Sequence, residues 1–94
     1  MTSEKLVFRA HALRRMFRRG IGLDEVHQAL STGETIESYP QDIPYPSRLV
    51  LGWSGNRALH IVTADNTEDR ETIVITVYEP DPALWNTDFR RRKP

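Results

Sequence analysis

The sequence contains no cysteine and no long apolar run, and each absence excludes a class of protein. Without cysteine, the fold cannot depend on disulfide bonds or on a thiolate metal site. No apolar stretch approaches the roughly 18 residues that a membrane-spanning helix needs. The opening residues, MTSEKLVFRA, also lack the apolar core of a signal peptide. We therefore expect a soluble, cytoplasmic protein that does not associate with a membrane.

Net charge is likewise absent, but the charges are unevenly distributed along the chain. Residues 1–20 have a net charge of +5, residues 21–85 a net charge of −8, and residues 86–94 a net charge of +3. This separation indicates a basic surface that meets an anion or an acidic partner. The alternative is that the basic ends simply offset the acidic middle within the folded monomer.

The chain has the length of one domain, which we assign to residues 1–94. Apolar residues recur with helical periodicity over residues 9–19 and again over residues 23–32. Gly20 follows the first of these segments and is a typical helix stop. The side chains expected to form the buried stripe of the first helix, about 120° wide, are Leu6, Ala10, Leu13, Met16 and Phe17.

After the second helix the pattern changes to the alternation that is typical of strands. We expect strands over residues 35–39, 48–53, 57–64 and 72–78. The Gly-containing turn at residues 54–56 joins the middle two as a hairpin. Because amphipathic helices need a sheet face to cover, the predicted fold is α+β, with two N-terminal helices packed on a four-stranded, mainly antiparallel sheet. The ends, residues 1–5 and 90–94, are expected to be flexible.

The first predicted helix also has a cationic face. His11, Arg14, Arg15 and Arg18 fall within about 100° of one another on a helical projection, and Arg19 lies at their edge. Arginine binds phosphate through a planar fork of donors, and histidine titrates near neutral pH. We predict that this face binds phosphate. The alternatives are a solvated helix face for the arginines and a capping or packing role for the histidine.

Three polar side chains are expected on one face of neighbouring strands. Alternation along the strands places His60, Thr76 and Tyr78 together. His60 offers a second titrating group, and Tyr78 offers a hydroxyl for general acid–base chemistry. His60 lies in the apolar run LHIVTA, however, and is explained equally well as a core histidine. The histidines have no metal-ligand spacing, so we expect neither a metal nor another cofactor.

Five short motifs occur in order along the chain, namely HA-x-x-R-M-x-x-R-G-I, L-x-x-G-E, R-L-V-L-G, L-H-I-V and T-V-Y-E-P-D-x-x-x-W. With this order and spacing, from about residue 10 to residue 92, the sequence resembles the small bacterial family called domain of unknown function 4258. The positions that match the family pattern are His11, Arg15, Arg19, Gly20, His60, Thr76, Tyr78 and Trp85.

By similarity of layout, that family resembles the RelE/ParE-type toxins and the BrnT toxin. The resemblance implies a RelE/ParE-like two-layer domain that acts as a metal-independent endoribonuclease of a bacterial toxin–antitoxin system. Its partners would be RNA or the ribosome and a cognate antitoxin. The expected catalytic residues are His11, Arg15, His60 and Tyr78. The expected phosphate-binding residues are Arg14, Arg18, Arg19, Thr76, Arg90, Arg91 and Arg92.

A second function is also compatible with the sequence. A non-catalytic binding module would use the same basic face to dock nucleic acid or an acidic protein. A composite catalytic site needs His11 and His60 to meet, so the side of the sheet that the helices cover is the first structural test of the predicted chemistry.

Overall fold

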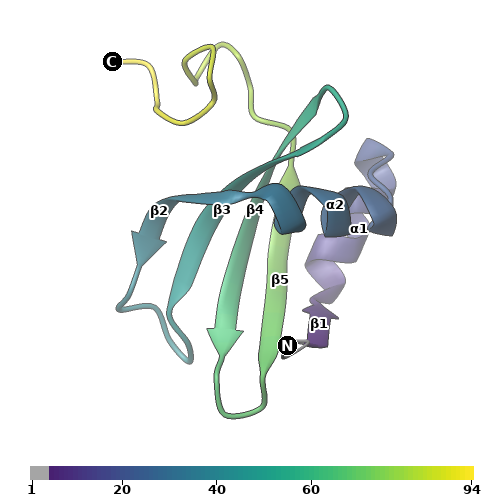
Figure 1. Cartoon of the computed structure of the whole chain (residues 1–94), viewed down its shortest axis with the longest axis vertical. Coiled ribbons are helices and arrows are strands. Elements are labelled where there is room, and N and C mark those ends of the chain that lie inside the picture. Colours follow the sequence, from purple (N-terminus) through teal and green to yellow (C-terminus); the bar gives the residue numbers. More distant parts are fainter. Residues whose placement is uncertain (1–4) are drawn as a thin grey trace.

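The computed structural model describes residues 5–94, which form two helices and a five-stranded mixed sheet (Figure 1). In chain order the elements are β1 (Lys5–Phe8), α1 (Ala10–Arg19), α2 (Leu23–Thr32), β2 (Glu34–Tyr39), β3 (Ser47–Ser54), β4 (Arg57–Asn66) and β5 (Glu71–Tyr78). The strand order is β1-β5-β4-β3-β2. Strands β2 to β5 form an antiparallel meander, and β1 pairs with β5 in parallel. The α+β class is therefore confirmed.

The prediction of four strands was wrong because it missed β1. The segment KLVF is only four residues long and is followed almost directly by a helix. Leu6 was therefore assigned to the apolar stripe of that helix instead of to a strand. The place of β1 depends on a pairing across the chain, in which the Lys5 amide donates to the Arg70 carbonyl at 3.0 Å. Lys5 is thus part of a strand rather than of a loose end. The rest of the expected flexible start, residues 1–4, lies outside the described residues.

Both helices contribute to one apolar core against one face of the sheet. The core cluster joins α1 and α2 to alternate residues of the strands, including Leu59 and Ile61 of β4. Helix α2 approaches β3 so closely that a Cβ on Gly52 would lie 2.0 Å from the Ala29 carbonyl oxygen. None of the helices in residues 5–94 is long and apolar enough to cross a membrane.

The predicted buried stripe of α1 was right for Met16 but wrong for Ala10, Leu13 and Phe17. Phe17 is 89% exposed and Leu13 is 45% exposed, whereas Ala12 and Met16 are buried. The small Ala12 side chain faces the sheet, where it permits close packing against β5. The helix is therefore rotated away from the orientation that would bury its largest side chains, and it presents an aromatic ring to solvent.

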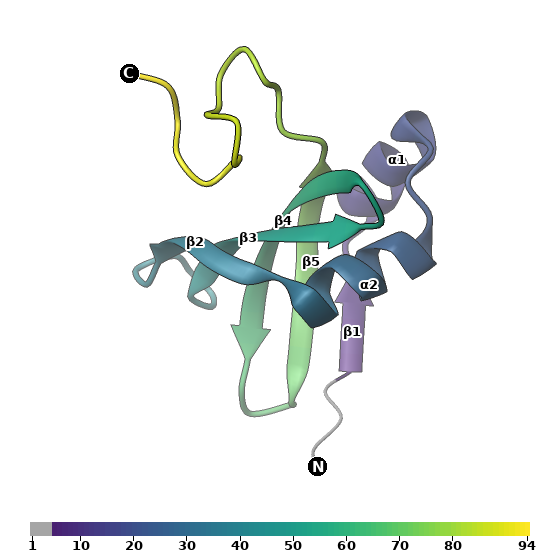
Figure 2. The same cartoon turned by 45° about the horizontal axis from the view of Figure 1, so that its top comes forward.

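The C-terminal segment, drawn in yellow-green to yellow, lies over one end of the sheet and contacts His60 on the face opposite the helices (Figure 2). Trp85 is 3% exposed, and its ring meets that of His60 edge-on at a centroid distance of 4.4 Å. Trp85 and Arg92 form an isolated antiparallel bridge. The Lys93 amide donates to the Leu84 carbonyl at 2.9 Å. Much of the end that was expected to be flexible is thus hydrogen-bonded into a strap, here defined as residues 84–93.

Candidate functional site

A pocket of about 580 Å³ opens at the C-terminal end of β5. Helix α1 contributes two arginines, β5 contributes Tyr78, and the strap contributes Trp85 and a third arginine. The residues that line it are Arg15, Arg19, Tyr78, Glu79, Pro80, Asp81, Pro82, Leu84, Trp85 and Arg92. We call this the terminal pocket, because it brings together the two basic ends of the chain.

The arginines give the terminal pocket its cationic character. Among the described residues, no hydrogen bond or ion pair engages the guanidinium of Arg15 or Arg19. Arg92 lies 4.8 Å from the ring centroid of Trp85 and 3.9 Å from a carboxylate oxygen of Glu37. Such a geometry holds Arg92 in place over the aromatic ring. Within residues 5–94, two cations without an ion-pair partner and one restrained cation are therefore available to an anion.

A second hollow, of about 360 Å³, runs along the outer side of α1. The residues that line it are His11, Arg14, Arg15, Arg18 and Arg19. It shares Arg15 and Arg19 with the terminal pocket, so the two hollows adjoin. The predicted cationic face of α1 thus exists as a surface groove, and no residue of this helix is acidic to neutralise it.

His60 is fully buried and both of its ring nitrogens are occupied. Nε2 lies 2.9 Å from the carbonyl oxygen of Phe89, and Nδ1 lies 3.3 Å from the hydroxyl oxygen of Tyr78. A carbonyl oxygen only accepts, so Nε2 carries the proton and Nδ1 accepts from the Tyr78 hydroxyl. Burial lowers the pKa of the imidazole from its ordinary 6.5, and the Phe89 carbonyl partly opposes this effect. His60 is therefore a neutral core histidine in this fold.

Tyr78 links this buried pair to the terminal pocket. His60 and Tyr78 are directly opposite each other on β4 and β5, with ring centroids 5.3 Å apart. Burial raises the pKa of the Tyr78 hydroxyl, while the positive charges of Arg92 and Arg15 act in the opposite direction. The hydroxyl hydrogen is directed toward His60, so the oxygen keeps its remaining lone pairs for a ligand.

The predicted composite of His11 and His60 was wrong. His60 lies on the sheet face that the strap covers, whereas α1 packs on the face that carries Leu59 and Ile61. His11 is exposed on α1 and lines only the helix groove. Alternation along β4 explains the separation, because adjacent residues of a strand point to opposite faces. The two histidines cannot act on one phosphate.

Some of the remaining residues that were predicted to bind phosphate line the terminal pocket, and the others do not. Thr76 shares the face of His60 and Tyr78, as expected, but its hydroxyl is buried and does not line the terminal pocket. Arg90 pairs with Glu34 at 2.6 Å. Arg91 lines neither hollow. Of the three tail arginines, only Arg92 reaches the terminal pocket.

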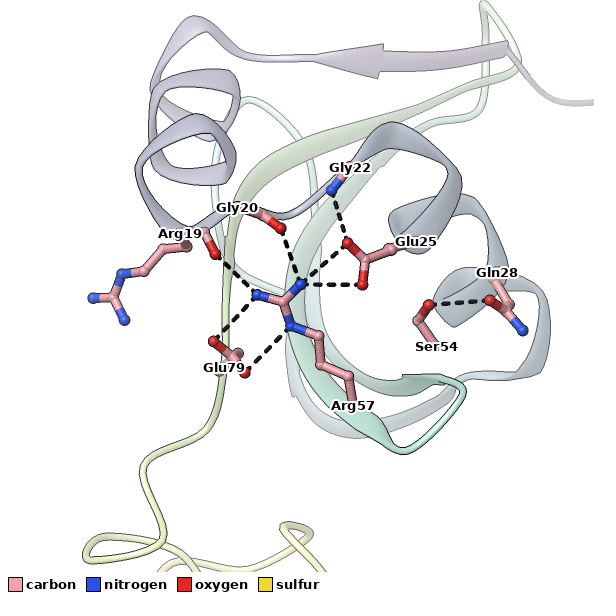
Figure 3. A network of polar contacts seen from close by, with 8 residues as sticks. All are labelled: Arg19, Gly20, Gly22, Glu25, Gln28, Ser54, Arg57 and Glu79. Carbon is pink, nitrogen blue, oxygen red and sulfur yellow. Dashed lines mark hydrogen bonds and ion pairs between the residues drawn. The ribbon is translucent and has the colours of Figure 1, made fainter.

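Arg57 was missed by the sequence reasoning, and it contacts two residues that line the terminal pocket, Arg19 and Glu79 (Figure 3). Its guanidinium donates to the carbonyls of Arg19 and Gly20 at 2.9 and 3.0 Å, which caps the C-terminal end of α1. It also pairs with Glu25 of α2 at 3.1 Å and with Glu79 at 3.3 Å. One side chain thereby ties two helices to the end of β5, and it fixes the backbone of Arg19.

A signal for Arg57 was present in the sequence. It is one of only three arginines or lysines in the acidic segment 21–85, and it directly follows the hairpin turn. An isolated cation among carboxylates is a candidate for an ion-pair network. Its partner Glu25 also accepts the Gly22 amide at 3.0 Å, and this amide, followed by Arg57, lowers the pKa of Glu25.

Over residues 8–79, from the end of β1 to just past the end of β5, the sequence matches the family described as Domain of unknown function (DUF4258). The chain belongs to this family. The matched range includes Arg15, Arg19, His60 and Tyr78 but ends before Trp85 and Arg92. No curated protein and no solved structure matches the chain. Arg15, Arg19, Tyr78 and Glu79 of the terminal pocket thus lie within the DUF4258 range, whereas the residues that the strap contributes lie outside it.

Proposed function

We propose that this protein is a toxin-like endoribonuclease that cleaves RNA at the terminal pocket without a metal ion. The observation that supports the proposal is that Arg15, Arg19 and Arg92 line one pocket together with Tyr78, and that the charges of Arg92 and Arg15 act on the pKa of its hydroxyl. Guanidinium groups bind phosphate oxygens through paired donors and remain charged at any physiological pH. Three such groups line the pocket, against the two carboxylates of Glu79 and Asp81, and Glu79 is paired with Arg57.

The proposed reaction is attack of a ribose 2′-oxygen on the adjacent phosphorus. The new bond joins this oxygen to phosphorus and the bond to the 5′-oxygen breaks, which leaves a 2′,3′-cyclic phosphate and a 5′-hydroxyl. Arg15, Arg19 and Arg92 stabilise the charge that develops on the phosphoryl oxygens. Donors aimed in advance at developing charge typically make the largest contribution to such catalysis.

Proton transfer is assigned to groups that reach the helix groove and the terminal pocket. In the bound state the Tyr78 oxygen accepts a hydrogen bond from the 2′-hydroxyl, since the hydrogen of Tyr78 itself is directed toward His60. During the attack the 2′-hydroxyl proton leaves Tyr78 and passes through a water molecule to the imidazole of His11, which lines the adjoining helix groove one helical turn from Arg15. Water protonates the departing 5′-oxygen. In this scheme His60 is a positioning residue that never contacts RNA.

The test is cleavage of a labelled 20-nucleotide single-stranded RNA in the presence of EDTA. The wild-type protein is expected to give fragments that end in a 2′,3′-cyclic phosphate. Arg15→Ala should slow cleavage by about 100-fold or more, as removal of one charge-stabilising donor does in other enzymes. The matched control is Arg70→Asn, at the opposite end of β5, where asparagine tolerates the backbone φ of 53°. Equal cleavage by wild type and Arg15→Ala would show the proposal to be wrong.

A non-catalytic binding module is the second candidate, and the burial of His60 favours it. Without that histidine, the terminal pocket has only carboxylates as bases, and Glu79 is already paired with Arg57. A binding module would retain RNA with an affinity that falls steeply with salt, because phosphate contacts release counterions. Binding that is lost in Arg15→Ala, without fragments from any variant, would select this function.

We extend the proposal to partners on the basis of the RelE/ParE-type layout that the sequence suggested. A toxin of this kind acts on free RNA or on messenger RNA within the ribosome, and a cognate antitoxin restrains it. Addition of translating ribosomes to the cleavage assay separates the two substrates, because a ribosome-dependent enzyme cleaves only in their presence. Growth arrest that requires Arg15 and is relieved by a neighbouring gene product would support the toxin role in cells.

A further inference from the structure

Phe17 is the one Phe, Tyr or Trp residue of α1, and it lies beside the helix groove. Its side chain is 89% exposed, and no ring contact joins it to another residue in the described range 5–94. Arg14 and Arg18, one turn before it and directly after it, line the groove and have no ion-pair partner among those residues. Leu13, one turn before Phe17, is 45% exposed. In the described part of the chain, a ring without a ring contact is thus bordered by cations without an ion-pair partner.

We propose that Phe17 is a stacking platform for an unpaired base, and that the substrate of this protein is single-stranded RNA. The inference rests on the proposed function, since it extends the path of the RNA out of the terminal pocket. Sites for single-stranded nucleic acid combine a cationic groove that follows the backbone with aromatic rings on which bases stack. The outer side of α1 has both components.

The groove gives the path of the strand. Arg15 and Arg19 line both the terminal pocket and the helix groove. An RNA whose scissile phosphate lies in the terminal pocket therefore continues along α1, where Arg14 and Arg18 hold neighbouring phosphates. A base next to those phosphates reaches the Phe17 ring only if it is not paired, because the faces of paired bases are stacked within a duplex.

Charge distinguishes this ligand from a protein partner. The cores of protein interfaces are depleted of charged residues. The groove and its rim instead combine five cationic or titratable side chains with only two exposed apolar ones, Leu13 and Phe17. These two side chains also offer far less than the roughly 800 Å² that each partner buries in a standard protein interface. The observations therefore favour a polyanion with aromatic bases.

The experiment is fluorescence anisotropy with 2′-fluoro RNA, which cannot undergo attack by a 2′-hydroxyl. A single strand and the corresponding duplex are titrated with wild type, Phe17→Ala and Phe17→Tyr. Phe17→Ala should weaken binding of the single strand by about 10-fold, within the range of base–aromatic stacking, and should leave duplex binding unchanged. Phe17→Tyr retains a ring and should bind as wild type does. The matched control is Ile43→Ala, which removes another apolar side chain that is 91% exposed.

The salt dependence of RNA binding is a second measurement that tests the proposal. Arg14→Ala should reduce the slope of log affinity against log salt by about 0.7, the value for one phosphate of a single strand, whereas Phe17→Ala should leave the slope unchanged. If Phe17→Ala binds the single strand as wild type does, the stacking platform is wrong while the proposed function stands. If the loss in Phe17→Ala is equal for strand and duplex, the single-strand assignment is wrong. If wild type binds neither RNA, the proposed function itself fails.

Discussion

His60 shows most clearly how one residue can have the chemistry of a catalyst and the environment of a core residue. Its imidazole is enclosed by Trp85 and Tyr78, and the Phe89 carbonyl accepts its one proton. A histidine in this position holds a hydroxyl rather than exchanges protons with a substrate. The contribution of His60 to the site is therefore the orientation of Tyr78.

The first prediction concerns the pH dependence of stability. Burial lowers the pKa of folded His60 below 6.5, the value that we take for the unfolded chain. Between these two pKa values the unfolded state binds more protons, so the free energy of unfolding should fall as pH decreases below 6.5. The slope is at most about 1.4 kcal/mol per pH unit for one group. Chemical denaturation between pH 5 and pH 8 measures it.

The control for this prediction is His27→Gln, because His27 is exposed on α2. That variant should retain the wild-type slope, and His60→Gln should have a flatter one. If His60→Gln does not fold, the ring resonances of His60 in the wild-type protein follow the same titration. A His60 that titrates at or above 6.5 would contradict the burial argument.

At the scale of elements, the close approach of α2 to β3 depends on Gly52. A Cβ at this position would lie 2.0 Å from the Ala29 carbonyl oxygen, which is too close for any small adjustment of a side chain. We expect Gly52→Ala to lower the free energy of unfolding by about 3 kcal/mol, as overpacking of a rigid contact does. Urea denaturation measures the change.

The matched variant is Gly55→Asn in the hairpin turn. Nothing lies within 4 Å of a Cβ there, and asparagine tolerates the backbone φ of 59°. We expect a change within about 0.5 kcal/mol. Similar losses in the two variants would mean that backbone conformation, and not the packing of α2, determines the need for glycine.

The junction of the helices with β5 depends on Arg57. Arg57→Lys keeps the charge but loses the fork of donors that serves Arg19, Gly20, Glu25 and Glu79 together. Because this cluster is partly exposed, we expect a loss of about 1–2 kcal/mol in the free energy of unfolding. Arg48→Lys alters an ordinary ion pair with Asp65 and should cost less than about 1 kcal/mol. Equal losses would show that Arg57 is not a special junction.

Elements whose limits are set by neighbouring residues could be predicted from the sequence. Helix α2 has its predicted bounds, since Gly22 and Glu25 form a cap within one turn. The rotation of α1 could not be predicted, because it depends on how closely Ala12 approaches β5. Strand β1 was missed for the same reason, since its partner strand is more than 60 residues away in the chain.

The candidate site was predictable to a similar degree. Arg15 and Arg19 lie on the local cationic face that periodicity identified. The position of Arg92 and the burial of His60 both depend on the strap, which is held over the sheet by the contacts of Trp85 with His60 and Arg92. The sequence of the strap has no helical or strand periodicity from which this path could be predicted. Local patterns therefore predicted the residues that α1 contributes to the terminal pocket. The residues that the strap contributes could not be predicted, because their positions depend on tertiary packing.

At the scale of the whole molecule, both basic ends of the chain contribute arginines to the terminal pocket. They differ in how many of their positive charges are paired with carboxylates. The tail is partly paired with the acidic middle, through Arg90 with Glu34 and Arg92 with Glu37. The guanidinium groups of α1 have no such partners among residues 5–94, and their groove lies against the terminal pocket. The neutral total therefore conceals a surface that remains cationic after folding, and RNA is the anion that we propose for it.

The central claim, that RNA binds at the terminal pocket, is tested most directly by an NMR titration. A short single-stranded 2′-fluoro RNA is added to ¹⁵N-labelled wild-type protein, and the shift of each backbone amide is followed. We predict the largest shifts at Arg15, Arg19 and Tyr78, with little change at Arg70, which directly precedes β5 and lies roughly 25 Å from Tyr78 along the strand. Shifts that cluster around Arg70, or no shifts at millimolar RNA, would contradict the account.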